Sequence, residues 1–227
     1  MKYVKRIICL ANSRKISGRC VAGKEVAGNG FGGWIRPVSG RPAGELSEYD
    51  RSYQNGVDPK LLDVIDIQMT QHAPHGFQTE NHVIDDQAYW SLVRTCSLPE
   101  LTAAIDSVPG ILWNNLSSSG NGLHDRVSEA NAAQLQGSLL LIQVSKLTIS
   151  NAVEGAAFGN AKRKVRGSFT YNNVPYMLSI TDPTVEREYL QKPDGEYVAG
   201  PAILSISLGD TWQGYAYKLI AGVFFLP

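Results

Sequence analysis

Long apolar runs are absent from this sequence of 227 residues. A helix that crosses a membrane needs about 20 consecutive apolar residues, whereas the longest apolar stretches, residues 138–144 and 221–226, have the length of strands. The apolar run 7–11, which follows a short basic start, is soon interrupted by polar residues, so we expect no signal peptide. These absences predict a soluble, cytoplasmic protein without a membrane partner.

Cysteine and histidine are also scarce. Cys9, Cys20 and Cys96 are odd in number and widely spaced, which argues against a disulfide framework and against a zinc site built on cysteines. His72 and His75 lie in a segment rich in proline and glycine, and a metal site needs more ligands held in a fixed geometry. We therefore predict no metal and no cofactor.

Catalytic motifs are missing as well. The sequence contains no Gly-x-Ser-x-Gly, and Asp63 and Asp66, three residues apart on a predicted strand, point to opposite faces. The glycines of segment 28–33 are followed by Pro37 rather than by a helix, so they predict a tight turn and not a dinucleotide-binding motif. We predict no catalytic residue, and hence a binding protein rather than an enzyme.

Charge is unevenly distributed along the chain, although the formal net charge is zero. Residues 1–41 contain nine Lys or Arg residues against a single acid, a net charge of +8, and residues 42–113 contain three against eleven, a net charge of −8. A second basic cluster lies at residues 162–166. Local basic clusters on a neutral chain favour a specific anionic ligand, although solvated strand faces give the same pattern.

Strand patterns run through most of the chain. Apolar runs and apolar–polar alternation predict strands at residues 3–10, 18–26, 61–69, 78–84, 139–150, 164–171, 174–180, 202–208 and 215–225. Asn172 and Asn173 predict a hairpin turn, because Asn tolerates a positive φ. Short helices are predicted at residues 86–95, 99–106 and 183–190.

This order of elements predicts a mainly β protein that consists of two small barrels. The first barrel covers residues 1–113 and contains a helical insertion at about 85–106. Residues 114–137 form a connecting segment, and the second barrel covers residues 138–227. No internal repeat is visible in the sequence.

Basic residues around the first predicted hairpin, with an aromatic residue on the next strand, are candidates for ligand contacts. Single-stranded nucleic acid is bound by this combination, because bases stack on aromatic rings while cations contact phosphates. Trp34 and Arg36 alternate onto one face of their strand, which places a ring beside a guanidinium. The candidates in the first barrel are Arg14, Lys15, Arg19, Lys24, Trp34 and Arg36.

A similar arrangement occurs in the second barrel, where basic residues and an aromatic residue share one predicted strand. Its candidates are Lys162, Arg163, Lys164, Arg166 and Tyr171, with the cations on phosphates and the ring in a stacking role. The alternative for both barrels is that Trp34 and Phe169 are core residues whose neighbouring cations lie at the rim.

Several segments resemble the bacterial dual OB-containing domain family. The most specific are residues 5–15 (KRIICLANSRK), 18–25 (GRCVAGKE) and 33–39 (GWIRPVS). The resemblance continues through residues 61–67 (LLDVIDI), 164–171 (KVRGSFTY), 179–183 (SITDP), 207–210 (SLGD) and 214–219 (GYAYKL). It implies two tandem OB-like barrels that are expected to bind nucleic acid, often among bacterial conflict and phage-defence genes, and it supplies no catalytic residues to carry over to this sequence.

We therefore predict a module that binds single-stranded or structured DNA or RNA and works with a partner effector protein. Two alternatives remain open. The acidic segment 42–113 would suit an adaptor or regulatory subunit that docks another protein. The glycine-rich turn together with Arg36 would suit a sensor of a nucleotide or another small anion.

Overall fold

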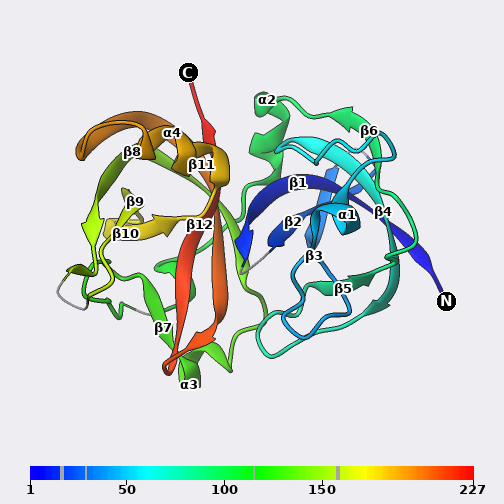
Figure 1. Cartoon of the computed structure of the whole chain (residues 1–227), viewed down its shortest axis with the longest axis horizontal. Coiled ribbons are helices and arrows are strands. Elements are labelled where there is room, and N and C mark those ends of the chain that lie inside the picture. The colour runs from blue at the N-terminus through cyan, green and yellow to red at the C-terminus, as the bar shows by residue number, and fades with distance from the viewer. Residues whose placement is uncertain (16–17, 29, 115, 157–158) are drawn as a thin grey trace. The chain divides into compact units, whose positions relative to one another are not determined.

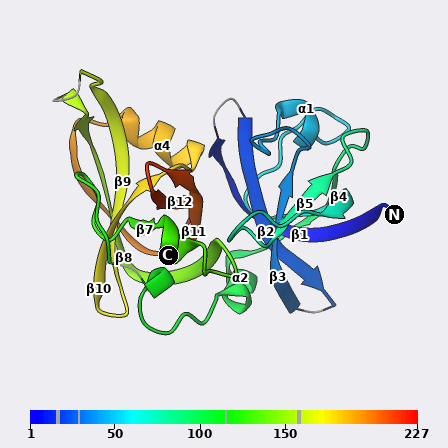
Figure 2. The same ribbon diagram turned by 90° about the horizontal axis from the view of Figure 1, so that it is seen from below.

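The computed structural model describes residues 1–15, 18–28, 30–114, 116–156 and 159–227 (Figures 1 and 2). The chain divides into two compact units. The first unit consists of Met1–Ile105 and Gln136–Ser138, and the second of Asp106–Leu135 and Leu139–Pro227. Within the described ranges no helix is long and apolar enough to cross a membrane. Strands dominate both units, so the mainly β fold is confirmed.

A sheet that closes on itself forms the first unit. Its strands are β1 (Tyr3–Lys15), β2 (Gly18–Ala27), β3 (Gly30–Val38), β4 (Asp63–His72), β5 (Asn81–Ile84) and β6 (Ser91–Thr95). Strands β1, β2, β3, β5 and β4 are hydrogen-bonded in that order, and β4 returns to β1. The pair β3–β5 is parallel and the other pairs of the barrel are antiparallel. β6 pairs with β4 at the edge of this sheet.

Apolar residues at alternate positions fill the first barrel. Ile7 of β1 lies opposite Ile65 of β4, and Ile67 and Met69 follow at the next inward positions of β4. All of these side chains are buried in one cluster, together with Trp90. Burial of a large apolar side chain contributes about 1.5–3 kcal/mol, so this cluster is a main source of the barrel's stability.

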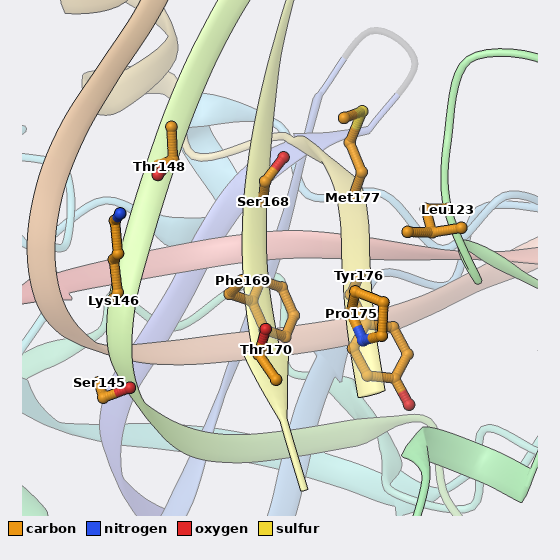
Figure 3. A pocket seen from close by; sticks show the side chains of 10 residues that line it. All are labelled: Leu123, Ser145, Lys146, Thr148, Ser168, Phe169, Thr170, Pro175, Tyr176 and Met177. Carbon is orange, nitrogen blue, oxygen red and sulfur yellow. The ribbon is translucent and has the colours of Figure 1, made fainter. Parts of the chain in front are cut away.

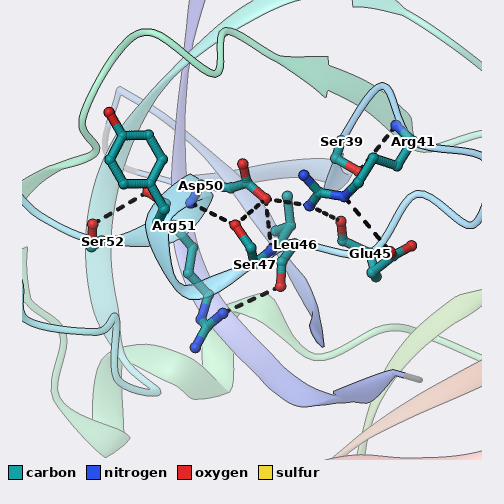
Figure 4. A network of polar contacts seen from close by, with 9 residues as sticks. Ser39, Arg41, Glu45, Leu46, Ser47, Asp50, Arg51 and Ser52 are labelled. Atoms are coloured by element: carbon teal, nitrogen blue, oxygen red, sulfur yellow. Dashed lines mark hydrogen bonds and ion pairs between the residues drawn. The ribbon is translucent and has the colours of Figure 1, made fainter. Parts of the chain in front are cut away.

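A polar network holds the short helix between β3 and β4 (Figure 4). α1 (Glu48–Arg51) begins after Ser47, whose hydroxyl accepts a hydrogen bond from the Asp50 N–H at 3.3 Å, while the Asp50 carboxylate accepts one from the Ser47 N–H at 2.6 Å. Arg41 forms an ion pair with the same carboxylate. Arg41, one of the nine cations of residues 1–41, is therefore paired within the first unit, as are Lys2, Lys5, Arg6 and Arg36.

The segment 85–106 differs from its prediction. The prediction of a helix at residues 86–95 is wrong, because this stretch contains β6, which pairs with β4. Helical structure begins only at α2 (Leu98–Leu101), with a capping box at its start, and continues as the 3₁₀ turn η1 (Thr102–Ala104). A short apolar run fits the helical and the strand period equally well, and only its pairing partner decides between them.

A second closed sheet forms the second unit. Its strands are β7 (Arg126–Ser128), β8 (Leu139–Glu154), β9 (Lys162–Tyr171), β10 (Val174–Ile180), β11 (Gly195–Trp212) and β12 (Tyr215–Phe225). Strands β8, β9, β10, β12 and β11 are paired in that order, β11 returns to β8, and β7 lies along β12. Its helices are η2 (Leu112–Asn114), α3 (Glu129–Ala132) and α4 (Pro183–Leu190).

Several elements of the second unit agree closely with the predictions from local sequence signals. β10, β12 and α4 have the predicted bounds. Asn172 and Asn173 have φ values of 48° and 63°, which confirms the two-residue turn between β9 and β10. α4 begins after Asp182, whose carboxylate accepts a hydrogen bond from the Thr184 N–H at 2.9 Å.

Both barrels follow one plan. In each, a parallel pair (β3–β5 or β10–β12) joins the third strand to the fifth, and a helix (α1 or α4) lies between the third and fourth strands. An OB fold is a five-stranded Greek-key barrel of this kind. The prediction of two tandem OB-like barrels is confirmed.

The segment predicted as a connection, residues 114–137, contains β7 and α3 of the second unit. Its last residues, with Ser138, pack with the first unit. Residue 115 lies outside the described residues. In the predicted glycine turn, Gly28 has a φ of 57°, the positive φ that such a turn requires, and residue 29 is likewise outside the described residues.

A lysine is buried inside the second barrel. Lys218 of β12 is 1% exposed, and its ammonium group lies 5.3 Å from the ring centroid of Tyr176. Burial lowers the pKa of Lys218 to about 8, although the charge of Asp125 acts in the opposite direction. The protonated form is therefore less stable in the folded protein than in water.

We expect the free energy of unfolding of wild type, relative to that of Lys218→Met, to be larger at pH 10 than at pH 7, because only wild type carries the buried ammonium group whose pKa is lowered. The ordinary pKa of a lysine is 10.5, so between pH 8 and 10.5 the unfolded state binds more protons than the folded state and wild-type stability rises with pH. Urea unfolding of both proteins at pH 7 and pH 10 measures the difference between them, which should shift in favour of wild type at pH 10. A difference that is the same at both pH values would contradict the prediction.

Candidate nucleic-acid interface

Basic residues gather at the end of the β1–β2 hairpin. Arg14 lies directly opposite Arg19, and Lys15 follows opposite Gly18. Arg14 is exposed, Lys15 and Arg19 are half-buried, and each interacts with other groups of the chain. Like charges on directly opposed strand positions repel one another, and the strand register brings these three predicted cations together at this end of the hairpin.

Lys24 and Trp34 face each other across β2 and β3. The Lys24 ammonium lies 5.8 Å from the centroid of the Trp34 ring, which is a cation–π distance. Lys24 is only 7% exposed and Trp34 is half-buried. The ring expected to stack on bases is therefore already in contact with a cation of the neighbouring strand.

Arg36 lies inside the first unit and not on the solvent-facing surface expected from the sequence. It is 2% exposed, and its guanidinium lies 3.2 Å from a carboxylate oxygen of Glu80. The same guanidinium donates a hydrogen bond to the Ser138 hydroxyl at 2.8 Å, and that hydroxyl donates to Glu80. Its charge is thus compensated internally, which strand periodicity alone cannot reveal.

Two arginines of β9 also have partners within the second unit. Arg163 donates hydrogen bonds to the carbonyls of Leu190 and Lys192 at 2.5 and 2.8 Å, at the C-terminal end of α4, and pairs with Asp194. Cations at a helix C-terminus stabilise the helix. Arg166 makes two hydrogen bonds to the carboxylate of Glu154, at 2.5 and 2.9 Å. Both guanidinium groups therefore have clear structural roles.

Tyr171 points toward the core and does not offer the exposed ring expected from the sequence. Its side chain packs against the apolar cluster of the second barrel, and its hydroxyl donates to the Val108 carbonyl at 3.2 Å. The reason is its position on β9, where it shares the inward face with the buried residues Val165 and Phe169.

The outward face of β9 is different, since it carries the exposed Lys164 and polar side chains. Ser168 and Thr170 follow Lys164 and Arg166 at alternate positions of this face. Lys162, at the start of the strand, is exposed as well. Among the described residues, no ion pair involves Lys162 or Lys164.

A hollow of about 510 Å³ lies on this outward face, over β8, β9 and β10 (Figure 3). Thr148, Ser168 and Met177 are paired in one row across the three strands. Thr170 of β9 lies opposite Pro175 of β10 in the next outward-facing row. The stacked rings of Phe169 and Tyr176, 5.4 Å apart, lie beneath these side chains. The lining residues are Leu123, Ser145, Lys146, Thr148, Ser168, Phe169, Thr170, Pro175, Tyr176 and Met177.

The hollow combines hydroxyl groups, apolar side chains and one cation. Hydroxyls can donate and accept hydrogen bonds, and the apolar lining suits sugar and base surfaces. Lys146, the cation, is exposed, and sequence analysis missed it because it is a single basic residue in an apolar strand pattern. One signal for Lys146 was available in the sequence. It directly follows Ser145, where the apolar run of β8 changes to apolar–polar alternation.

Of the two histidines weighed as metal ligands, His72 is the last residue of β4, and His75 lies between β4 and β5, where its backbone exchanges hydrogen bonds with Gln78. His82 lies on β5. The rings of His72 and His82 are 4.7 Å apart, and the Tyr3 hydroxyl lies 2.7 Å from Nδ1 of His82. Burial, together with the charge of His72, lowers the pKa of His82 to about 4, so its imidazole is neutral at pH 7. In the described part of the chain, no group of three or more His, Cys, Asp or Glu residues is arranged to hold a metal ion.

Comparison with known proteins supports the architecture. A family model described as a dual OB-containing domain matches residues 5–223. The match covers nearly the whole chain and includes strands of both units, so the resemblance found in the sequence is confirmed. Comparison with curated proteins finds no match.

We expect Glu80→Gln to lower the free energy of unfolding by about 3–5 kcal/mol, because it leaves the buried Arg36 guanidinium without a compensating charge. Asp66→Asn breaks the more exposed ion pair with Arg6 and serves as the control, with a much smaller expected loss. Urea unfolding of the three proteins measures both effects. Equal losses in the two variants would mean that the buried pair has no special importance.

Proposed function

We propose that this chain, which belongs to the dual OB-containing domain family, binds single-stranded or structured nucleic acid on the outward face of β8, β9 and β10. The fold is of a type that binds nucleic acid, and the second and third strands of an OB barrel are the usual ligand surface. In the second unit these strands are β9 and β10. The observation that carries the proposal is the hollow on this face.

The cations on this face are spaced for a polyanion. Lys146 lies at one end of the hollow, and Lys164 lies further along β9 on the same outward face. Lys164 precedes Thr170 by six positions of β9, which corresponds to about 20 Å along the strand. A few nucleotides fill such a distance, with phosphates at the lysines and sugars or bases over the hydroxyl and apolar lining between them.

The net positive charge of the face is modest, since Arg166 is paired with Glu154. Lys146, Lys162 and Lys164 remain as phosphate contacts. Each phosphate contact to a single strand contributes about −0.7 to the slope of log K against log salt. We therefore expect the slope of log K against log salt to be about −2 for the three lysines of the second unit. The slope becomes steeper if Arg14, Lys15 and Arg19 also contact phosphates.

The anion-sensor alternative loses its main cation, because Arg36 is buried against Glu80. A protein-binding alternative has one observation in its favour, the edge strand β6, in which every residue is exposed, including Leu92 and Val93. Such an edge can pair with an extended segment of a partner, and the acidic composition of residues 42–113 favours a basic one. A partner effector, cytoplasmic localisation and a place in bacterial phage-defence systems stay predictions.

We expect Lys146→Glu/Lys164→Glu to lower the affinity for a single-stranded oligonucleotide by at least tenfold and to reduce the salt slope by about 1.4, because two phosphate contacts become repulsive. Fluorescence anisotropy across a salt series, with DNA and RNA strands and their duplexes, measures both quantities. Lys60→Glu, an exposed charge reversal in the first unit, is the control. Wild-type binding that is flat with salt, or equal affinities in the three proteins, would overturn the proposal.

A further inference from the structure

Trp212 is an exposed aromatic side chain at the tip of the β11–β12 hairpin. It is 61% exposed, although tryptophan is highly buried on average in folded proteins. Gln213 and Gly214 form the turn, with φ values of 49° and 79° at these two central positions. A two-residue turn of this kind matches the twist of its strands, so the ring is presented by a well-defined hairpin rather than by a long loop.

Two tyrosines and an arginine surround this ring. Trp212 lies opposite Tyr215, and Tyr217 shares the outward face of β12, with its ring centroid 6.3 Å from that of Trp212. The guanidinium of Arg126, on β7, lies 3.9 Å from the centroid of Tyr215 and donates a hydrogen bond to Ser117. We call Trp212, Tyr215, Tyr217 and Arg126 the aromatic cluster.

The aromatic cluster lies close to the hollow. Leu123, which lines the hollow, exchanges two backbone hydrogen bonds with Met177 of β10, at 3.0 and 3.1 Å. Three residues later on the same segment, Arg126 lies opposite Tyr217 of β12. Three residues span at most about 11 Å, so one or two nucleotides can bridge the hollow and the cluster.

We propose that the aromatic cluster binds an unpaired nucleobase of the strand whose phosphates lie along the hollow, and that the protein therefore selects single-stranded over duplex nucleic acid. This inference rests on the proposed function. Trp212 and Tyr217 offer ring faces for stacking, whereas Arg126 already covers Tyr215. A duplex keeps its bases stacked on one another, so it cannot offer a base to the cluster without unstacking.

The charges around the cluster favour a base over a phosphate. The acidic residues Glu129 and Asp210 are exposed beside the hairpin, and the Glu129 N–H donates to the Gly214 carbonyl at 2.9 Å. They partly offset the charge of Arg126. A neutral, flat group is therefore better suited to this position than an anion is, while the lysines of the hollow take the phosphates.

The test compares wild type, Trp212→Ala and Trp212→Phe by fluorescence anisotropy. The probes are a short single-stranded oligonucleotide, the same strand with abasic sites, and its duplex. We expect Trp212→Ala to weaken binding of the intact strand by about tenfold, with no change for the abasic strand or in the salt slope, and Trp212→Phe to retain most of the affinity. Tyr49→Ala removes an equally exposed aromatic ring of the first unit and is the matched control.

The outcomes separate this inference from the proposed function. If Lys146→Glu/Lys164→Glu weakens binding but Trp212→Ala does not, the aromatic cluster has no role and the proposed function stands. Equal wild-type affinity for the intact and abasic strands, or for the strand and its duplex, also overturns the inference. If wild type binds no oligonucleotide, both proposals fail, and an oligosaccharide whose affinity depends on Trp212 would identify a different ligand class.

Discussion

Each unit depends on the closure of its sheet by one parallel strand pair. β3 joins β5 in the first unit, and β10 joins β12 in the second through Ser179 and Ile180. Closure pairs the backbone groups that an open sheet leaves at its edges. It also sends alternate side chains of each strand to the inside or the outside of the barrel, so that a residue's place along its strand decides whether it supports the core or meets a ligand.

Three of the arginines predicted as contacts differ in their surroundings from the lysines of the proposed ligand face. Arg36, Arg163 and Arg166 are all engaged by carboxylates or carbonyls of their own unit. A planar guanidinium with several fixed donors suits such multiple contacts, whereas a lysine ammonium is a point charge on a flexible stem. Lys146 and Lys164 are exposed on the face where a ligand is expected. The neutral net charge therefore hides a division between structural and available cations.

The second unit combines its proposed contacts on one side of the β9–β10–β12 surface. The short segment from Leu123 to Arg126 connects the hollow to the aromatic cluster, because it pairs first with β10 and then with β12. Backbone pairing thus determines the distance between a surface suited to phosphates and one suited to bases.

Local signals in the sequence determined most of the secondary structure. The alternation in residues 174–180, the Asn172–Asn173 turn and the helix after Asp182 depend on neighbouring residues only, and each was predicted correctly. The family resemblance added the OB-type arrangement of the barrels.

Only the tertiary structure decided what the charged and aromatic residues contact. Arg36 meets Glu80 because β3 pairs with β5, and Trp212 stays exposed because its hairpin extends past the core. Helix and strand periods report which face a side chain occupies, but a closed barrel brings together residues far apart in the chain. The partner on that face therefore follows from strand register and closure, which no local pattern encodes.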